Sequence, residues 1–108
     1  MYATRRLLQA CRITLFSRDN CGLCTSAKGV LSDVWDRRPF VFREVNLALP
    51  EPESKSWREL YDFDIPVIHI SRAEAREEQV EAAGKAVKLM HRFTPEQVEA
   101  KMDQVEES

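Results

Sequence analysis

Short apolar runs alternate along the chain with stretches in which apolar residues recur every three or four positions. The first pattern is typical of covered strands and the second of helices with one buried face. The predicted order is strand, helix, strand, helix, strand, strand and helix, with the strands at 13–16, 40–47, 66–70 and 85–90. This order predicts an α/β domain in which the first two strands pair in parallel through a helical crossover.

Each predicted helix has one face of apolar residues that we expect to be buried. These faces are formed by Ala27, Val30, Leu31, Val34 and Trp35 in the first helix, by Trp57, Leu60 and Tyr61 in the second, and by Val98, Met102 and Val105 in the last. Asn20 is the expected N-cap of the first helix, and Pro39 ends that helix. Thr94 and Gln97 form a capping box around Pro95, which predicts where the last helix begins.

Two cysteines separated by two residues, Cys21 and Cys24, lie at the junction between the first strand and the first helix. A C-x-x-C pair in this position is typical of a redox dithiol. Unpaired backbone N–H groups and the positive end of the helix dipole stabilise a thiolate there. We therefore expect the pKa of Cys21 to lie below the value of about 8.5 of a free thiol. Cys24 is near enough to close a disulfide onto Cys21, and Arg18 is placed to add a positive charge.

Other interpretations of the cysteine pair remain open from the residues alone. Cysteine is often a small buried hydrophobe, so both side chains could belong to the core. A structural zinc site needs about four ligands, and this motif supplies two of them. Cys11, His69 and His91 do not converge on the motif by their spacing, so no metal site is predicted, and His69 is expected to be a satisfied strand imidazole. A binding module that uses the same surface without turnover is the alternative to an enzyme.

The composition is that of a single globular domain, because 108 residues with 44% hydrophobic and 31% charged residues can form a core without disulfide staples. A formal net charge of −2 gives no general attraction to nucleic acid, and no apolar run is long enough to cross a bilayer. Three cysteines suit a reducing compartment better than a secreted disulfide framework. We expect a monomer in the cytoplasm or the mitochondrion that binds neither nucleic acid nor membrane.

Two segments stand apart by their charge. Residues 1–11 form a basic leader, which is either a poorly ordered extension or a short mitochondrial presequence, and the domain is expected at 12–108. Segment 71–84 is rich in charged residues, poor in apolar ones and too long for a hairpin turn. It is therefore predicted to be an insertion in the form of a solvated loop or a frayed polar helix.

With Cys21-Gly22-Leu23-Cys24 after one strand and Ile65-Pro66 opening a later one, the chain resembles the thioredoxin superfamily and, within it, the small glutaredoxin-like proteins. The resemblance covers about residues 12–104. It implies a thioredoxin-like fold with a four-stranded mixed sheet flanked by helices, and a cis proline, Pro66, beside the dithiol. It also implies that Cys21 is the nucleophile and that Cys24 resolves the mixed disulfide.

The same resemblance implies a thiol-disulfide oxidoreductase that acts on protein or glutathione disulfides. Ile65, Pro66 and Arg92 are candidate substrate-binding residues, and Arg18 stands where glutaredoxins carry a lysine that helps to bind glutathione. The chain departs from the family before the last helix, where His91-Arg92-Phe93-Thr94 replaces a glycine pair. We therefore expect weak glutathione binding and no obligatory cofactor. A glutathione-dependent iron–sulfur-binding glutaredoxin is the remaining alternative.

Overall fold

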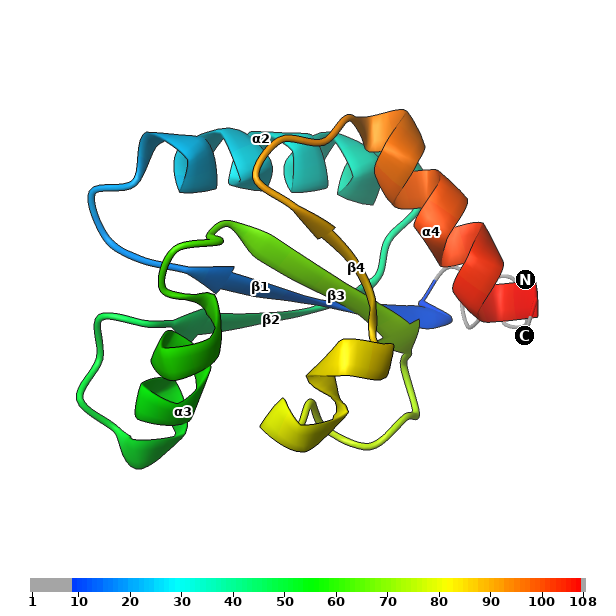
Figure 1. The fold of residues 1–108 in the computed structure, drawn as a ribbon. Coiled ribbons are helices and arrows are strands. Elements are labelled where there is room, and N and C mark those ends of the chain that lie inside the picture. The colour runs from blue at the N-terminus through cyan, green and yellow to red at the C-terminus, as the bar shows by residue number, and fades with distance from the viewer. Residues whose placement is uncertain (1–8, 108) are drawn as a thin grey trace.

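The computed structural model describes residues 9–107, which form a four-stranded sheet in the order β2-β1-β3-β4 with helices on both faces (Figure 1). The elements are β1 (Cys11–Ser17), α2 (Gly22–Arg37), β2 (Val41–Asn46), α3 (Pro52–Tyr61), β3 (Val67–Arg72), the 3₁₀ helix η1 (Val80–Lys85), β4 (Val87–Met90) and α4 (Pro95–Glu107). β1 is parallel to β2 and antiparallel to β3, and β3 is antiparallel to β4. The predicted element order and the mixed sheet are confirmed.

Side chains along β1 alternate between the two faces of the sheet, which separates two apolar cores. Ile13 and Leu15 belong to the core under α2 and α4, whereas Phe16 belongs to the core under α3 and η1 (Figure 1). The predicted apolar face of α4 is fully buried as Val98, Met102 and Val105. The two cores hold α2 and α3 on opposite sides of β1, and this fixes the loop that follows β1.

Two helix positions predicted to be buried are exposed. Trp35 on α2 is 46% exposed and Leu60 on α3 is 41% exposed, while Leu31, Val34 and Trp57 are buried as expected. Because β2 is the edge of the sheet, the flank of α2 that carries Trp35 has no further strand to pack against. The prediction from helical spacing was therefore right for the residues at the centre of each apolar face, such as Leu31 and Trp57, and wrong for Trp35 and Leu60 at its edge.

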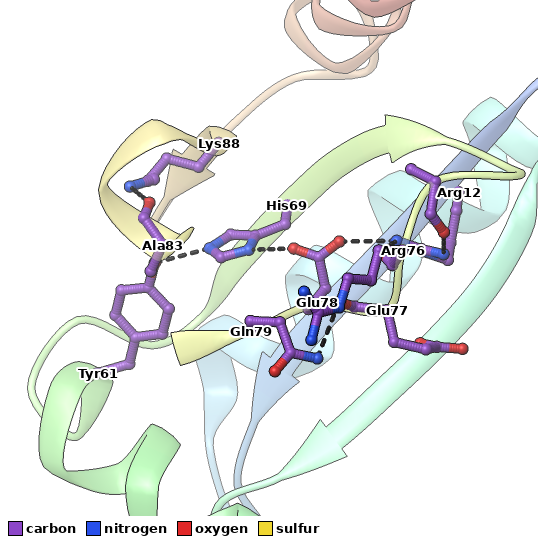
Figure 2. A network of polar contacts seen from close by, with 10 residues as sticks. Arg12, Tyr61, His69, Arg76, Glu77, Glu78, Gln79, Ala83 and Lys88 are labelled. Atoms are coloured by element: carbon purple, nitrogen blue, oxygen red, sulfur yellow. Dashed lines mark hydrogen bonds and ion pairs between the residues drawn. The ribbon is translucent and has the colours of Figure 1, made fainter. Parts of the chain in front are cut away.

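Segment 71–84 is anchored to the sheet (Figure 2). Its first two residues extend β3, and η1 lies near its end. The carboxylate of Glu78 accepts a hydrogen bond from Arg12 at 2.9 Å and lies 2.7 Å from Nδ1 of His69. Because the side chain of Arg12 is only 3% exposed, its charge requires a partner inside the protein. More than half of segment 71–84 is exposed, and after the end of β3 it consists of turns, irregular chain and η1, as the prediction of a solvated loop or frayed helix expects. The prediction missed, however, that Glu78 supplies the partner of Arg12.

The first strand begins one residue before the expected start of the domain at residue 12. Cys11, expected to be the last residue of the leader, is the first residue of β1 and is buried in the core. Residues 1–8 lie outside the described part of the chain. The choice between a poorly ordered extension and a presequence concerns these residues, and it stays a prediction. None of the helices within residues 9–107 is both long enough and apolar enough to cross a membrane.

Candidate active site

The two cysteines of the motif lie where the loop after β1 enters α2. They are joined as a disulfide, with their Cα atoms 5.2 Å apart. Cys21 is the N-cap residue of α2, and its Sγ accepts a hydrogen bond from the backbone N–H of Cys24 at 3.1 Å. The prediction that Asn20 caps this helix was wrong: Asn20 adopts a left-handed conformation with φ of 58°, which asparagine tolerates better than most residues. The sulfur of Cys21 therefore occupies the capping position itself.

The two cysteines differ in their access to solvent. Cys24 is 3% exposed, whereas Cys21 is half-buried. Both line a groove of about 430 Å³ whose walls include Arg18, Asp19 and Lys28. Cys21 is therefore the more accessible of the two sulfurs.

The loop before β3 lies at the same end of the sheet as the dithiol. β1 ends at Ser17, and the antiparallel β3 begins at Val67, which pairs with Phe16. The Ile65–Pro66 peptide bond is cis, as the resemblance implies, and Pro66 is buried. Within residues 9–107, no hydrogen bond involves the backbone N–H or C=O of Ile65. This half-buried residue thus offers an unpaired peptide group at the same end of the sheet as the dithiol.

The loop after β4 reaches the same end of the sheet, because the backbone N–H of His91 donates to the carbonyl of Pro66 at 2.7 Å. His91 has a φ of 64°, a left-handed conformation that glycine adopts most easily. The turn thus forms with histidine in a conformation that favours glycine. Arg92 is exposed and, with Leu23 and Phe93, lines a hollow of about 150 Å³ beside the first turns of α2.

Arg18 forms an ion pair with Asp62, which follows α3. The two side chains are 38% and 35% exposed, so water screens the pair. The structure therefore places Arg18 near the dithiol, as the sequence suggests, but with its charge already matched. Asp62 was missed at the sequence level, since a residue 44 positions away carries no local signal of this contact.

A second charged group near the site was also missed. Glu44 on β2 accepts a hydrogen bond from the Ser17 hydroxyl at 2.6 Å and forms an ion pair with Lys28 at 3.0 Å. Burial by itself raises the pKa of the Glu44 carboxyl, but the bonds from Ser17 and Lys28 outweigh it and hold that pKa below its ordinary value. Glu44 is thus a carboxylate that ties the end of β1 and the second turn of α2 to the edge strand.

The N-terminus of α4 is closed by its own side chains. The N–H of Gln97 donates to the Thr94 hydroxyl at 3.1 Å, and the N–H of Thr94 donates to the Gln97 side-chain oxygen at 2.9 Å. The predicted capping box is confirmed. Two of the backbone donors that could hold an anion are therefore already used.

The other candidate ligands are accounted for by local contacts. His69 lies 2.6 Å from the hydroxyl of Tyr61 through Nε2, with Glu78 on the other ring nitrogen, so it is a satisfied core imidazole as expected. Burial and the adjacent carboxylate of Glu106 raise the pKa of the Cys11 thiol to about 12. Among residues 9–107, no three His, Cys, Asp or Glu side chains are grouped so that they could hold a metal ion.

The fold and the position of the dithiol define a thioredoxin-like protein. Thioredoxin O2 from Arabidopsis thaliana in its oxidised state superposes with a TM-score of 0.56 at 12% identity, over 96% of this chain and 87% of that chain. Thioredoxin 1 from Thermosipho africanus gives 0.57 at 14% identity, over 89% and 94% of the two chains. Thioredoxin f2 from Chlamydomonas reinhardtii gives 0.55 at 17% identity, over 89% and 80%. At these identities the likeness concerns the fold alone.

Similarity at the level of sequence identifies the family more narrowly. The family model of the glutaredoxin-like domain (DUF836) matches residues 12–103, which is most of the chain. The chain therefore belongs to this glutaredoxin-like family. Both the cysteine pair and Pro66 lie inside the matched range.

Proposed function

We propose that this protein is a thiol-disulfide oxidoreductase whose working pair is Cys21 and Cys24. The observation that carries the proposal is the N-cap position of the Cys21 sulfur, which accepts a hydrogen bond from a free N–H of the first helical turn. In the reduced protein the same N–H and the helix dipole stabilise a thiolate on this sulfur. A buried structural pair would not need a half-buried sulfur that faces a groove.

The reaction follows the usual course of thiol–disulfide exchange. The Cys21 thiolate attacks one sulfur of the substrate disulfide, forms a mixed disulfide with it, and releases the other sulfur as a thiolate that takes up a proton. Cys24 then loses its proton and attacks the Cys21 sulfur, which releases the second substrate thiol. Two electrons and two protons pass from the dithiol to the substrate, and the Cys21–Cys24 disulfide of the structure is the product form. A thiol reductant must regenerate the dithiol.

The unpaired backbone of Ile65 supports an extended polypeptide as substrate. A peptide segment that lies along Ile65 would complete its hydrogen bonds in the manner of strand addition. The same segment would then run past the groove that contains Cys21. Ile65 and the adjacent Pro66 are thus proposed to orient the substrate while the two cysteines perform the exchange.

Glutathione is proposed to be a poor ligand, because the groups that could bind its carboxylates are already bonded, lack an N–H or are exposed to water. The cap of α4 is filled by Thr94 and Gln97, and Pro95 has no N–H to offer. Arg18, the candidate cation for a glutathione carboxylate, is already paired with Asp62. Arg92 remains exposed, but a solvent-exposed charge contributes only about 0 to 1 kcal/mol. We propose protein disulfides as the substrates of a monomer that needs no obligatory cofactor.

Single-serine variants test the proposal directly. The wild-type protein, with dithiothreitol as reductant, should accelerate reduction of a disulfide-bridged peptide, and Cys21→Ser should abolish the acceleration. Cys24→Ser, first reduced and then freed of dithiothreitol, should accumulate a mixed disulfide on Cys21 that mass spectrometry detects. Cys11→Ser is the matched control, because its thiol is buried away from the groove, and it should keep the wild-type rate.

Two outcomes would contradict the proposal. Acceleration that survives in Cys21→Ser would show that the assigned nucleophile is wrong. A wild-type dithiol that binds the peptide without accelerating its reduction would favour the binding module. For the glutathione part, the assay couples turnover to glutathione reductase, and turnover there that matches the rate with dithiothreitol would show that the closed α4 terminus still forms a working site.

A further inference from the structure

Phe63 is the most exposed of the large apolar side chains in the described part of the chain. It is 94% exposed, whereas the others of this class, Trp35, Phe42, Leu49 and Leu60, are between 41% and 46% exposed. A single exposed phenylalanine needs no explanation by itself. Its position in the fold is what gives it meaning.

The loop that carries Phe63 is connected on both sides to the end of β1 and the segment that leads to the dithiol. On one side, the neighbouring Asp62 forms the ion pair with Arg18, three residues before Cys21. On the other, Ile65 offers the unpaired peptide group and precedes β3, whose first residue pairs with Phe16 near the end of β1. Figure 1 shows this loop rising from the end of α3 toward the side of the sheet on which α2 begins.

We propose that Phe63 is a specificity-determining residue that packs against an apolar side chain next to the cysteine of an extended protein substrate. The inference rests on the proposed function and names the substrate class of the same site. A substrate sulfur bonded to Cys21 holds the flanking substrate residues within a few residue lengths of it, about 3.3 Å each. When such a segment lies along Ile65, a residue beside its cysteine reaches the ring of Phe63, two positions away in the sequence.

The energetic reason for this selectivity is burial of the ring. A nearly fully exposed phenyl ring loses contact with water when an apolar side chain covers it, and this favours the bound state. Partial burial of the Phe63 ring by an apolar substrate side chain is expected to raise kcat/KM about tenfold over a substrate with a polar side chain there. A small disulfide or a peptide with polar flanks cannot make this contact.

The experiment compares two disulfide-bridged peptides that differ only beside the cysteine, one with leucine and one with serine there. The measured quantity is the ratio of kcat/KM for the leucine peptide to kcat/KM for the serine peptide. We expect the wild-type ratio to be about ten and Phe63→Ser to lower it to about one, mainly through KM. Phe42→Ser is the matched control, because Phe42 is exposed on β2 near the opposite end of the sheet, and it should keep the wild-type ratio.

The outcomes separate this inference from the proposed function. A wild-type ratio near one, or a Phe63→Ser ratio equal to the wild-type ratio, overturns the role of Phe63 and leaves the oxidoreductase intact. An equal loss with both peptides also overturns it, because Phe63 would then shape the dithiol and not the selectivity. If the wild-type protein reduces neither peptide, the proposed function itself fails.

Discussion

Replacing Glu78 by alanine removes the carboxylate that joins segment 71–84 to the sheet. In the wild-type protein this carboxylate accepts a hydrogen bond from Arg12 and contacts His69 (Figure 2). The side chains of Arg12 and His69 are 3% and 1% exposed. The variant leaves the Arg12 charge without a carboxylate and His69 without a partner on Nδ1. The free energy of unfolding should therefore fall.

The size of the loss follows from the contacts. Breaking a buried ion pair by removing one partner costs about 3 to 5 kcal/mol. The lower end applies here, because Glu78 is 14% exposed and Arg12 keeps its bonds to the carbonyls of Ala75 and Arg76, at 2.9 and 2.8 Å. A loss of about 3 kcal/mol lowers the Tm of a domain of this size by about 12 °C.

Urea unfolding followed by circular dichroism measures this free energy, with Glu77→Ala as the matched control. Glu77 is the adjacent residue, 66% exposed, and its ion pair with Arg43 spans 3.7 Å. Its loss should cost less than about 0.5 kcal/mol. A Glu78→Ala variant within about 1 kcal/mol of the wild type would refute the reasoning, since the network would then contribute no net stability.

Three further outcomes follow from single groups. In the reduced protein, brief iodoacetamide treatment should label Cys21 first, Cys24 more slowly and Cys11 only after unfolding. Cys11 should resist labelling because the pKa of its buried thiol is raised to about 12. Labelling of Cys11 as fast as that of Cys21, measured by mass spectrometry, would contradict this. Burial raises the pKa of Glu78, but the hydrogen bonds from His69 and Arg12 lower it by more, so the pKa lies below its ordinary value. Its stabilisation is thus present above its unfolded pKa of about 4.3 and lost as pH falls through the folded pKa, so Glu78→Gln should flatten the acid side of the stability profile measured in urea. Thr94→Ala should cost about 1 kcal/mol in the same assay, and no change would show that the capping box is dispensable.

Most of the architecture was predictable from local signals in the sequence. Each strand was recognised by an apolar run and each helix by its spacing, and these signals act within about ten residues of the chain. The capping box of α4 is a case in point, because Thr94 and Gln97 are three positions apart and contact each other directly. The position of the cysteine pair between a strand and a helix followed in the same way.

The N-cap of α2 shows where local signals were insufficient. Asn20 is the better capping residue by type, yet Cys21 takes that position. The path of the loop between β1 and α2 depends on where the sheet and the helix are packed, and this sets Asn20 in a left-handed conformation. The result brings the sulfur, and not an amide oxygen, to the helix N-terminus.

The charged contacts show the same limit more strongly. Arg18 and Asp62 are 44 positions apart, and Arg12 and Glu78 are 66 positions apart. A charged residue far along the chain is read from the sequence as solvated, because nothing nearby indicates a buried partner. For this reason the sequence predicts a solvated loop or a frayed polar helix for segment 71–84, and it does not predict the contact of Glu78 with Arg12.

The order of elements and the dithiol at the start of a helix could be predicted from local patterns, because periodicity, capping and the C-x-x-C spacing are properties of neighbouring residues. The mixed sheet was an expectation that the family resemblance implied. The tertiary structure was needed to show which sulfur caps α2, that Asp62 pairs with Arg18, and that the loop with Phe63 and Ile65 reaches the same end of the sheet as the dithiol. These depend on strand register and loop packing, which bring distant residues together only when the whole sheet has formed.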